Sequence, residues 1–135
     1  MNLLGGVHVK QLEGALQAAS TRQNVISNNL ANVDTPHYKR SEVQFESLLR
    51  EQLTGGTLAG KRTNEKHIPI GPNQSAVPEW KTVTDQSTVM GNNGNNVNVD
   101  VEMANQAENQ LRYYTYIGQI NHHINMMRTA IDVRR

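Results

Sequence analysis

The sequence predicts a mainly α-helical protein in which two long terminal helices pair as an antiparallel, coiled-coil-like unit. An irregular middle segment with a short helix and a small β-hairpin joins them. Apolar residues recur at alternating steps of three and four near both ends, as on a helix that packs along another. Between the ends, glycine, proline and asparagine interrupt the patterns. The expected organisation is an N-terminal helix and turn motif over 1–40, the middle segment over 41–96 and the C-terminal helix over 97–135.

The N-terminal helix is expected from about Val7 to Val33. Only Gln23 places a polar side chain in its apolar seam, where it would fix the register of an assembled bundle. The same spacing also fits a plain amphipathic helix in a globular bundle, and periodicity alone leaves the two interpretations equally supported. The seam residues of this helix are Val9, Leu12, Leu16, Ala19, Ile26, Leu30 and Val33.

A strong stop signal follows this helix between Ser27 and Lys39. Pro36 cannot continue a helix, and it pushes Thr35 out of the α region. Asp34 can turn the backbone through its own side chain. The last helical turns also hold amides that compete for backbone hydrogen bonds, at Asn28, Asn29 and Asn32. The chain is therefore expected to pass directly into an extended segment.

The middle segment is expected to begin with a short helix capped by Ser41, with Gln44 in the position of a capping-box partner. Glycines end this helix and leave a polar, flexible stretch as far as about Lys66. The run His67–Pro72 is typical of a short extended segment. Val77–Val83 is typical of a weak strand, and its proline, Pro78, permits edge pairing or no sheet at all.

A second long helix is expected from about Val101 to Arg134, after the glycine- and asparagine-rich linker Gly91–Asn96. Its apolar residues average 3.5 positions apart, which again indicates a seam. Tyr114 fits this seam, whereas Tyr113 and Tyr116 point off it and are expected to meet a neighbouring chain. The seam residues are Met103, Ala107, Leu111, Tyr114, Ile117, Ile120, Ile124, Met127 and Ile131.

Composition and charge exclude several function classes. The 135 residues fit one domain, and their 36% apolar share is below the roughly 45–50% of ordinary globular chains. Such a chain suits burial that is completed against other chains. A net charge of +1 with dispersed basic residues predicts neither nucleic acid nor an anionic membrane as partner. The lack of cysteine excludes disulfides and thiol catalysis.

The histidines and carboxylates form no catalytic or metal-binding pattern. His122 and His123 are adjacent, so on a helix they point about 100° apart and cannot chelate as an i, i+4 pair would. A solvated helix face and a helix N-terminus explain the two closest carboxylate pairs, Glu42 with Glu46 and Asp100 with Glu102. We therefore expect no enzyme, no metal, no cofactor and no small-molecule substrate.

The run Ser27–Lys39, Ser-Asn-Asn-Leu-Ala-Asn-Val-Asp-Thr-Pro-His-Tyr-Lys, resembles the N-terminal signature of bacterial flagellar rod and hook proteins. The chain length and the C-terminal run from Gly94 to Tyr113 are similar to the proximal rod members of that family. One departure is His37, where the family usually has glycine, whose permissive backbone suits a turn. The signature positions are Asn28, Asn29, Leu30, Ala31, Asn32, Thr35, Pro36 and Tyr38.

The resemblance implies a structural subunit that polymerises into the proximal part of the periplasmic rod of the bacterial flagellar basal body. It implies export through the flagellar type III export apparatus without a cleaved signal peptide. It also implies partners: copies of itself, other rod proteins, FliE and the membrane ring. The signature would direct the chain from the terminal helix to the outer segment and make hydrogen bonds between subunits. The expected assembly seam comprises Leu12, Leu16, Ala19, Ile26, Leu30, Leu111, Tyr114, Ile117, Ile120, Ile124, Met127 and Ile131.

Two other functions stay open at this point. A small helical adaptor or export chaperone would use the same seams in a closed oligomer of fixed size. A hydrolase acting on cell-wall material would need a pocket and an acid–base pair, and its candidate residues would be Glu42, Glu46 and Asp100. Because isolated helices gain little from propensity, the termini of a rod subunit are expected to be partly disordered when free and to order on assembly.

Overall fold

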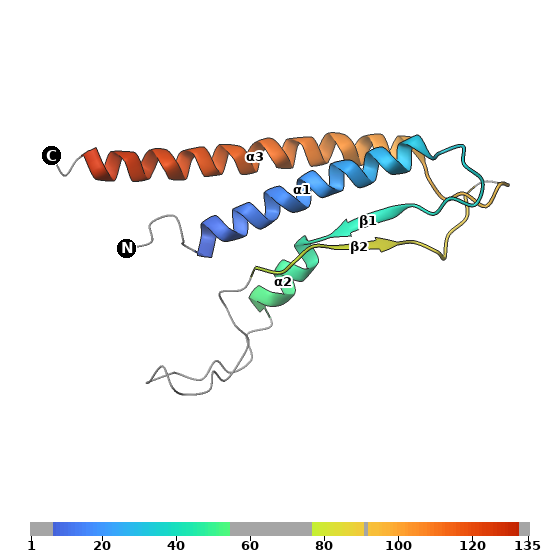
Figure 1. Ribbon diagram of the computed structural model, residues 1–135, viewed down its shortest axis with the longest axis horizontal. Helices are drawn as coiled ribbons and strands as arrows, with labels where there is room; N and C mark the ends of the chain where they lie inside the picture. The colour runs from blue at the N-terminus through green and yellow to red at the C-terminus, as the bar shows by residue number, and fades with distance from the viewer. Residues whose placement is uncertain (1–6, 55–76, 91, 133–135) are drawn as a thin grey trace, which may run out of the picture.

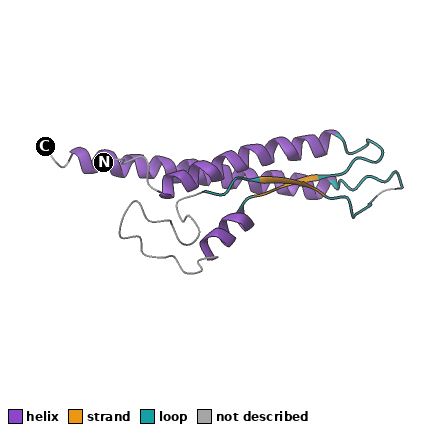
Figure 2. Ribbon diagram, turned by 60° about the horizontal axis from the view of Figure 1, so that its bottom comes forward, coloured by secondary structure: helices purple, strands orange, loops and turns teal. Residues whose placement is uncertain are grey.

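The computed structural model describes residues 7–54, 77–90 and 92–132. Its two long helices, α1 (Val7–Ala31) and α3 (Val99–Asp132), lie side by side and run antiparallel (Figure 1). Two short strands, β1 (Ser41–Gln44) and β2 (Lys81–Thr84), pair beside α1, and the short helix α2 (Glu46–Thr54) follows β1 (Figure 2). The predicted mainly α fold with two long terminal helices is confirmed. The stretches expected at 55–66 and 67–72 lie outside the described residues.

The core forms where β1 passes into α2, against small residues of α1. Phe45 is 1% exposed and packs on Ala15 and Ala18, and Leu49, Val77, Trp80 and Tyr116 cover the same cluster. Burying one phenylalanine side chain contributes about 2–3 kcal/mol. Space is so limited that a Cβ on Gly14 would lie 2.7 Å from Cγ1 of Val77. Small residues on α1 therefore allow the middle segment to approach the helix closely.

The prediction that a helix begins at Ser41 is wrong, because Ser41–Gln44 forms strand β1 and pairs antiparallel with β2. The pairing runs from Ser41 opposite Thr84 to Gln44 opposite Lys81, so the two strands come from opposite ends of the middle segment. Val43 is buried while its neighbours in the strand are exposed or half-buried, and this alternation is the strand period. The expected short helix exists, but it begins later, at Glu46.

The face that α3 turns towards α1 is not the predicted apolar seam over its first half. Glu102 and Asn109 are buried there, and Tyr116, one heptad further along, contacts the core cluster. The predicted seam residues Leu111 and Tyr114 are 69% and 61% exposed. Tyr116 was expected to point off the seam, but it lies on the same helix face as Asn109, whereas Tyr114, expected in the seam, is exposed. Contact of Tyr113 or Tyr116 with a neighbouring chain stays a prediction. Further along α3, residues Ile117, Ile120, Ile124 and Met127 are half-buried.

Amide groups join α1 to α3 where apolar contacts were expected. The amide nitrogen of Asn109 donates to the backbone carbonyl of Ala19 at 2.9 Å and to Oε1 of Gln23 at 3.3 Å. Gln23 was the polar residue of the predicted N-terminal seam, and its side chain accepts a hydrogen bond from Asn109 of α3.

No helix among the described residues is long and apolar enough to span a membrane.

Candidate functional site

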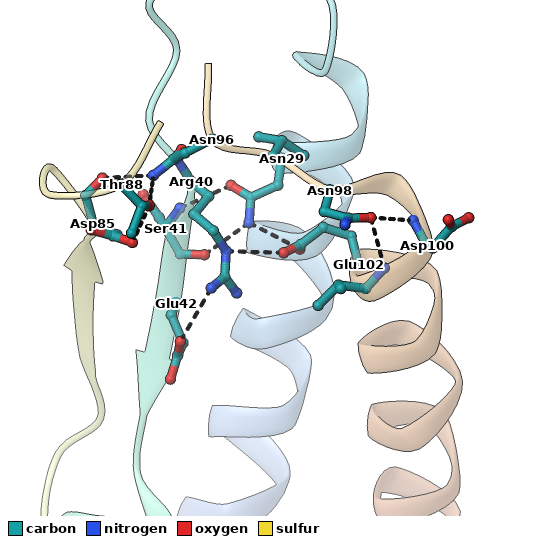
Figure 3. A network of polar contacts seen from close by, with 12 residues as sticks. Asn29, Arg40, Ser41, Glu42, Asp85, Thr88, Asn96, Asn98, Asp100 and Glu102 are labelled. Atoms are coloured by element: carbon teal, nitrogen blue, oxygen red, sulfur yellow. Dashed lines mark hydrogen bonds and ion pairs between the residues drawn. The ribbon is translucent and has the colours of Figure 1, made fainter. Parts of the chain in front are cut away.

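The family signature lies at the end of the helical pair where α1 stops and α3 begins. Five side chains from four parts of the chain lie at this end, and we call them the polar junction: Asn29 of α1, Arg40 before β1, Asn95 and Asn96 of the loop before α3, and Glu102 of α3. In Figure 3, Asn29, Arg40 and Glu102 point towards one another, and Asn96 lies beside the Arg40 backbone. Three members of the polar junction are amides, which can donate and accept at once, so one such side chain can connect two segments.

Asn29 holds the end of α1 against the start of β1. Its side chain is completely buried. Its Oδ1 accepts the Ser41 N–H at 3.0 Å, and its Nδ2 donates to the Ser41 carbonyl at 2.8 Å. The Tyr38 hydroxyl donates to the same Oδ1 at 3.2 Å. Asn29 therefore pairs with β1 as a neighbouring strand would.

Arg22, two turns earlier on α1, also binds the backbone of β1. Because it precedes Asn29 by seven residues, it lies on the same helix face. Its guanidinium donates to the Val43 carbonyl at 3.2 Å. The backbone edge of β1 that faces away from β2 is thus covered by side chains of α1. Covered edges of this kind do not pair with strands of other molecules.

Glu102 is the buried charge of the polar junction. It is 1% exposed, and its two carboxylate oxygens accept hydrogen bonds from Nδ2 of Asn29 at 3.0 Å and from Nε of Arg40 at 3.1 Å. A buried carboxylate is tolerated when it is paired and hydrogen-bonded in this way. Asn98 caps the helix behind it, since its Oδ1 accepts the N–H groups of Asp100 and Val101. The N-terminal end of α3 also favours the negative charge.

Asn95 and Asn96 connect the loop before α3 to the turn after α1 and to the segment leading into β1. The Asn95 amide nitrogen lies 2.8–2.9 Å from three carbonyl oxygens of the turn after α1, those of Asn32, Val33 and Thr35. The Asn96 oxygen accepts the Arg40 N–H at 2.7 Å. Its nitrogen donates to the Asp85 carbonyl and to the Thr88 hydroxyl. The stretch predicted to be a plain linker therefore carries two of the best-connected side chains in the described chain.

The turn after α1 depends on a close contact between His37 and Gly94. His37 has a φ of 59°, the left-handed conformation that glycine adopts most easily. This explains why glycine is usual at that position in the family that the signature resembles. Gly94 has a φ of 75°, and a Cβ there would lie 2.7 Å from Nδ1 of His37. The two backbones are joined by the His37 N–H, which donates to the Asn93 carbonyl at 3.0 Å.

We expect Gly94→Ala to lower the free energy of unfolding by about 2 kcal/mol, because the new Cβ meets an imidazole and the backbone is left-handed. Gly118→Ala is the matched control, since a Cβ at Gly118 meets nothing within 4 Å and alanine favours a helix interior by about 1 kcal/mol. Denaturant unfolding followed by circular dichroism measures both. Equal stability of the Gly94 variant and the native chain would contradict the contact.

A second polar network joins α1, α2 and α3. Arg22 donates to both carboxylate oxygens of Glu46, and Arg112 donates to Oε1 of Glu46 at 2.8 Å and also pairs with Glu108. Partial burial raises the pKa of Glu46, but the hydrogen bonds and charge of Arg22, with the charge of Arg112, lower it to a net value below the ordinary 4.5. The charge of Glu46 therefore favours the folded chain.

Stability is expected to fall as the pH drops below about 4.5, because a carboxylate whose pKa is lowered by folding stabilises the fold above its ordinary pKa and loses this contribution as it becomes protonated. Asp85 adds to the same loss, since hydrogen bonds from Thr88 and Ser87 lower its pKa. Glu46→Gln should weaken the pH dependence, whereas the exposed glutamate Glu51 of the same helix, changed to glutamine, should leave it in place. An unchanged profile in Glu46→Gln would contradict the prediction. Unfolding curves at several pH values test it.

A cleft of about 530 Å³ lies beside these networks, between α1, β1 and α3. Its charged lining is already paired: Arg22 with Glu46, Arg40 with Glu102, and Arg112 with Glu108. A catalytic acid–base pair needs carboxyl groups that converge with opposed pKa shifts, and in this lining the two arginines lower the pKa of Glu46. These ion pairs join α1, α2, α3 and the segment leading into β1.

The predicted signature residues have several environments. Asn29 is buried, and Asn32, Leu30 and Tyr38 are half-buried. The exposed members are Asn28, Ala31, Thr35 and Pro36. The amides of Asn29 and Asn32 make hydrogen bonds within the chain. Hydrogen bonds between subunits through the signature stay a prediction.

The predicted seam residues are also divided. Ala19 and Ile26 of α1 are buried, whereas Leu12, Leu16 and Leu30 are half-buried. On α3, the seam residues Leu111, Tyr114 and Ile131 are exposed. The other four seam residues are half-buried: Ile117, Ile120, Ile124 and Met127. Arg40, Asn95 and Asn96 were not predicted as site residues, and Glu102 was predicted only as a charge that suits the N-terminal end of its helix. The nearest signal was the asparagine run directly before a buried valine, Val97.

Comparison with known proteins identifies the family. A family model described as "Flagella basal body rod protein" matches residues 12–39. The flagellar basal body rod protein FlgB of Bacillus subtilis (strain 168) is 35% identical over 131 residues, which cover 97% of each chain. FlgB of Borreliella burgdorferi is 38% identical over 73% of this chain and 76% of its own. FlgB of Cereibacter sphaeroides is 32% identical over 93% of this chain and 91% of its own. The chain therefore belongs to the family of flagellar basal body rod proteins, as a structural rod subunit of the FlgB type.

Proposed function

We propose that the chain polymerises into the proximal part of the periplasmic rod, and that the exposed apolar face of α3 contacts neighbouring subunits there. This face comprises Met103, Leu111 and Tyr114, which are 56%, 69% and 61% exposed. Ala107 lies between them and is also exposed. An exposed apolar surface supports contact with another protein, and here it lies on a helix that presents polar groups to α1.

The location of this face carries the proposal. Met103, Leu111 and Tyr114 lie on the side of α3 that α1 does not cover, while Glu102 and Asn109 face α1. Each subunit would thus keep its helical pair together through polar contacts and use apolar contacts between subunits. Head-to-tail contacts between unlike surfaces give helical growth, as a rod requires.

The partners and the export route are part of the same proposal. We infer copies of this chain, other rod proteins and, at the base of the rod, FliE and the membrane ring as neighbours. The route would be the flagellar type III export apparatus, without a cleaved signal peptide. The names of the relatives as basal body rod proteins support this assignment. A closed adaptor or chaperone would instead bury the α3 face in an oligomer of fixed size.

The test replaces the gene in the bacterium that encodes the chain. Deletion should abolish swimming, and the native chain should restore it together with rods that can be isolated. Leu111→Asp should fold, because Leu111 is exposed, yet it should fail to enter rods, because a charge would have to be buried between subunits. Gln119→Asp adds the same charge at an exposed polar position of α3 and should restore swimming.

The outcomes distinguish the subunit contact, the rod function and the adaptor alternative. Normal rods containing Leu111→Asp would contradict the α3 face as a subunit contact. Swimming that persists after deletion would contradict the rod function itself. A purified chain that forms only a closed dimer, and whose deletion leaves rods intact, would support the adaptor instead.

A further inference from the structure

Asn93 and Gly94 form the one Asn-Gly pair in the 135-residue sequence, and it lies in the loop before α3. The backbone nitrogen that follows an asparagine can attack the carbon of that asparagine's side-chain amide. A Cβ on the following residue hinders this attack, and Gly94 has none. Asn93 is exposed to solvent, so water can reach the product.

Neighbouring groups are placed to assist the attack. The Asn95 N–H donates to Oδ1 of Asn93 at 3.2 Å, so a donor already faces the oxygen on which negative charge would develop. The His37 imidazole lies over Gly94, with Nδ1 2.7 Å from the position of a Gly94 Cβ. The His37 N–H also donates to the Asn93 carbonyl at 3.0 Å, which holds the ring beside this peptide. Histidine is the side chain that most often takes a proton in such reactions.

We propose that Asn93 is a site of spontaneous deamidation, promoted by the fold with His37 as the base. The Gly94 nitrogen bonds to Cγ of Asn93, and the bond from Cγ to Nδ2 breaks. The proton from the Gly94 nitrogen passes through the imidazole to the departing nitrogen, which leaves as ammonia. Water then opens the succinimide at one of its two carbonyl carbons and leaves aspartate or isoaspartate at position 93. Nothing is oxidised or reduced, and water is the only co-reactant.

The reaction would loosen the polar junction irreversibly. Isoaspartate at position 93 lengthens the main chain by one methylene group. Residue 93 accepts the hydrogen bond from the His37 N–H, and Asn95, two residues later, holds the turn after α1. Asn95 binds the carbonyls of Asn32, Val33 and Thr35, so a shift of this loop breaks several hydrogen bonds together. The modification would therefore mark aged subunits by a weakened connection between α1 and α3.

The first test incubates the purified full chain near neutral pH and measures the acid form at each asparagine by peptide mass spectrometry. Acid at position 93 should appear about tenfold faster than at Asn92, Asn95 or Asn96. It should also appear faster in the folded chain than in the same chain unfolded in urea, because only the fold brings His37 to Gly94. An equal or slower rate in the folded chain would overturn the role of the fold. A rate at Asn93 no higher than at its neighbours would overturn the site.

The second test separates the imidazole from the turn. Asparagine tolerates the left-handed backbone, so His37→Asn keeps the conformation and removes the base. Its folded chain should deamidate at Asn93 about fivefold or more slowly, with the rate in urea unchanged. His123→Asn, on α3, is the control and should leave both rates unchanged. If His37→Asn reacts like the native chain, His37 is not the base. The comparison of folded and unfolded native chain needs no variant, so it decides the role of the fold even if His37→Asn fails to fold.

Discussion

Asn29→Ala is expected to lower the free energy of unfolding by about 3 kcal/mol, the largest effect of a single side chain in the polar junction. The Asn29 side chain is fully buried and satisfies both backbone groups of Ser41 and one oxygen of Glu102. Alanine would leave these groups without the partner that the buried amide supplies. Each unsatisfied buried group costs about 1–3 kcal/mol, and a shift of β1 would recover part of this.

Asn28→Ala is the matched control. Asn28 is the same residue type one position earlier, and it is exposed. Its backbone carbonyl accepts a hydrogen bond from Asn32, which alanine would keep. The free energy of unfolding of the Asn28→Ala variant should stay within about 0.5 kcal/mol of that of the native chain. Denaturant unfolding by circular dichroism compares the two, and equal losses at Asn28 and Asn29 would show that the buried hydrogen bonds do not stabilise the fold.

Glu102→Ala is expected to cost about 2 kcal/mol. It removes the acceptor for Asn29 and Arg40 and leaves the guanidinium without its buried partner. The cost is below that of a fully buried ion pair, because the Arg40 side chain is 24% exposed and also lies near Glu42. Glu102→Gln should be nearly as unfavourable, since both carboxylate oxygens accept and an amide would turn its NH₂ group towards one of the two donors.

The control for Glu102 is Asp100→Ala, an exposed carboxylate in the same first turn of α3. It removes a similar interaction with the helix dipole and no buried contact, so the change should be about 0.5 kcal/mol or less. The double variant of Asn29 and Glu102 should cost less than the sum of the two single changes, because they share a hydrogen bond. Strict additivity in unfolding experiments would contradict a connected junction.

Much of the fold could be predicted from local pattern. The expected ends of the two long helices lie within about two residues of those observed, since a long run of the 3.6-residue period is a strong signal. The stop after α1 was also predicted, because proline and aspartate act on the backbone of their own and adjacent residues. The conformation of His37 was left open, and the structure gives it the left-handed backbone that glycine adopts most easily.

The polar junction could not be predicted in this way. Asn95 and Asn96 were expected in a linker because asparagine next to glycine is typical of turns. Their importance arises from backbone groups about sixty residues earlier in the chain, a carbonyl of Asn32 for Asn95 and the N–H of Arg40 for Asn96. Glu102 was explained by the end of its own helix, and nothing local indicated that Arg40 and Asn29 would cover it. The pair of half-buried Gln23 and buried Asn109 joins two helices in the same manner.

The sequence by itself determined the two long helices, the abrupt stop between them and the family, because these depend on residues close together along the chain. Only the tertiary structure decided that Ser41–Gln44 is a strand and that α3 turns Glu102, Asn109 and Tyr116 towards the rest of the chain. Four residues have too few local contacts to select helix or strand, so the pairing with β2 and the burial of Phe45 select it. Which face of a long helix is buried depends on what it meets, and α1 presents alanines and amide acceptors that suit polar partners.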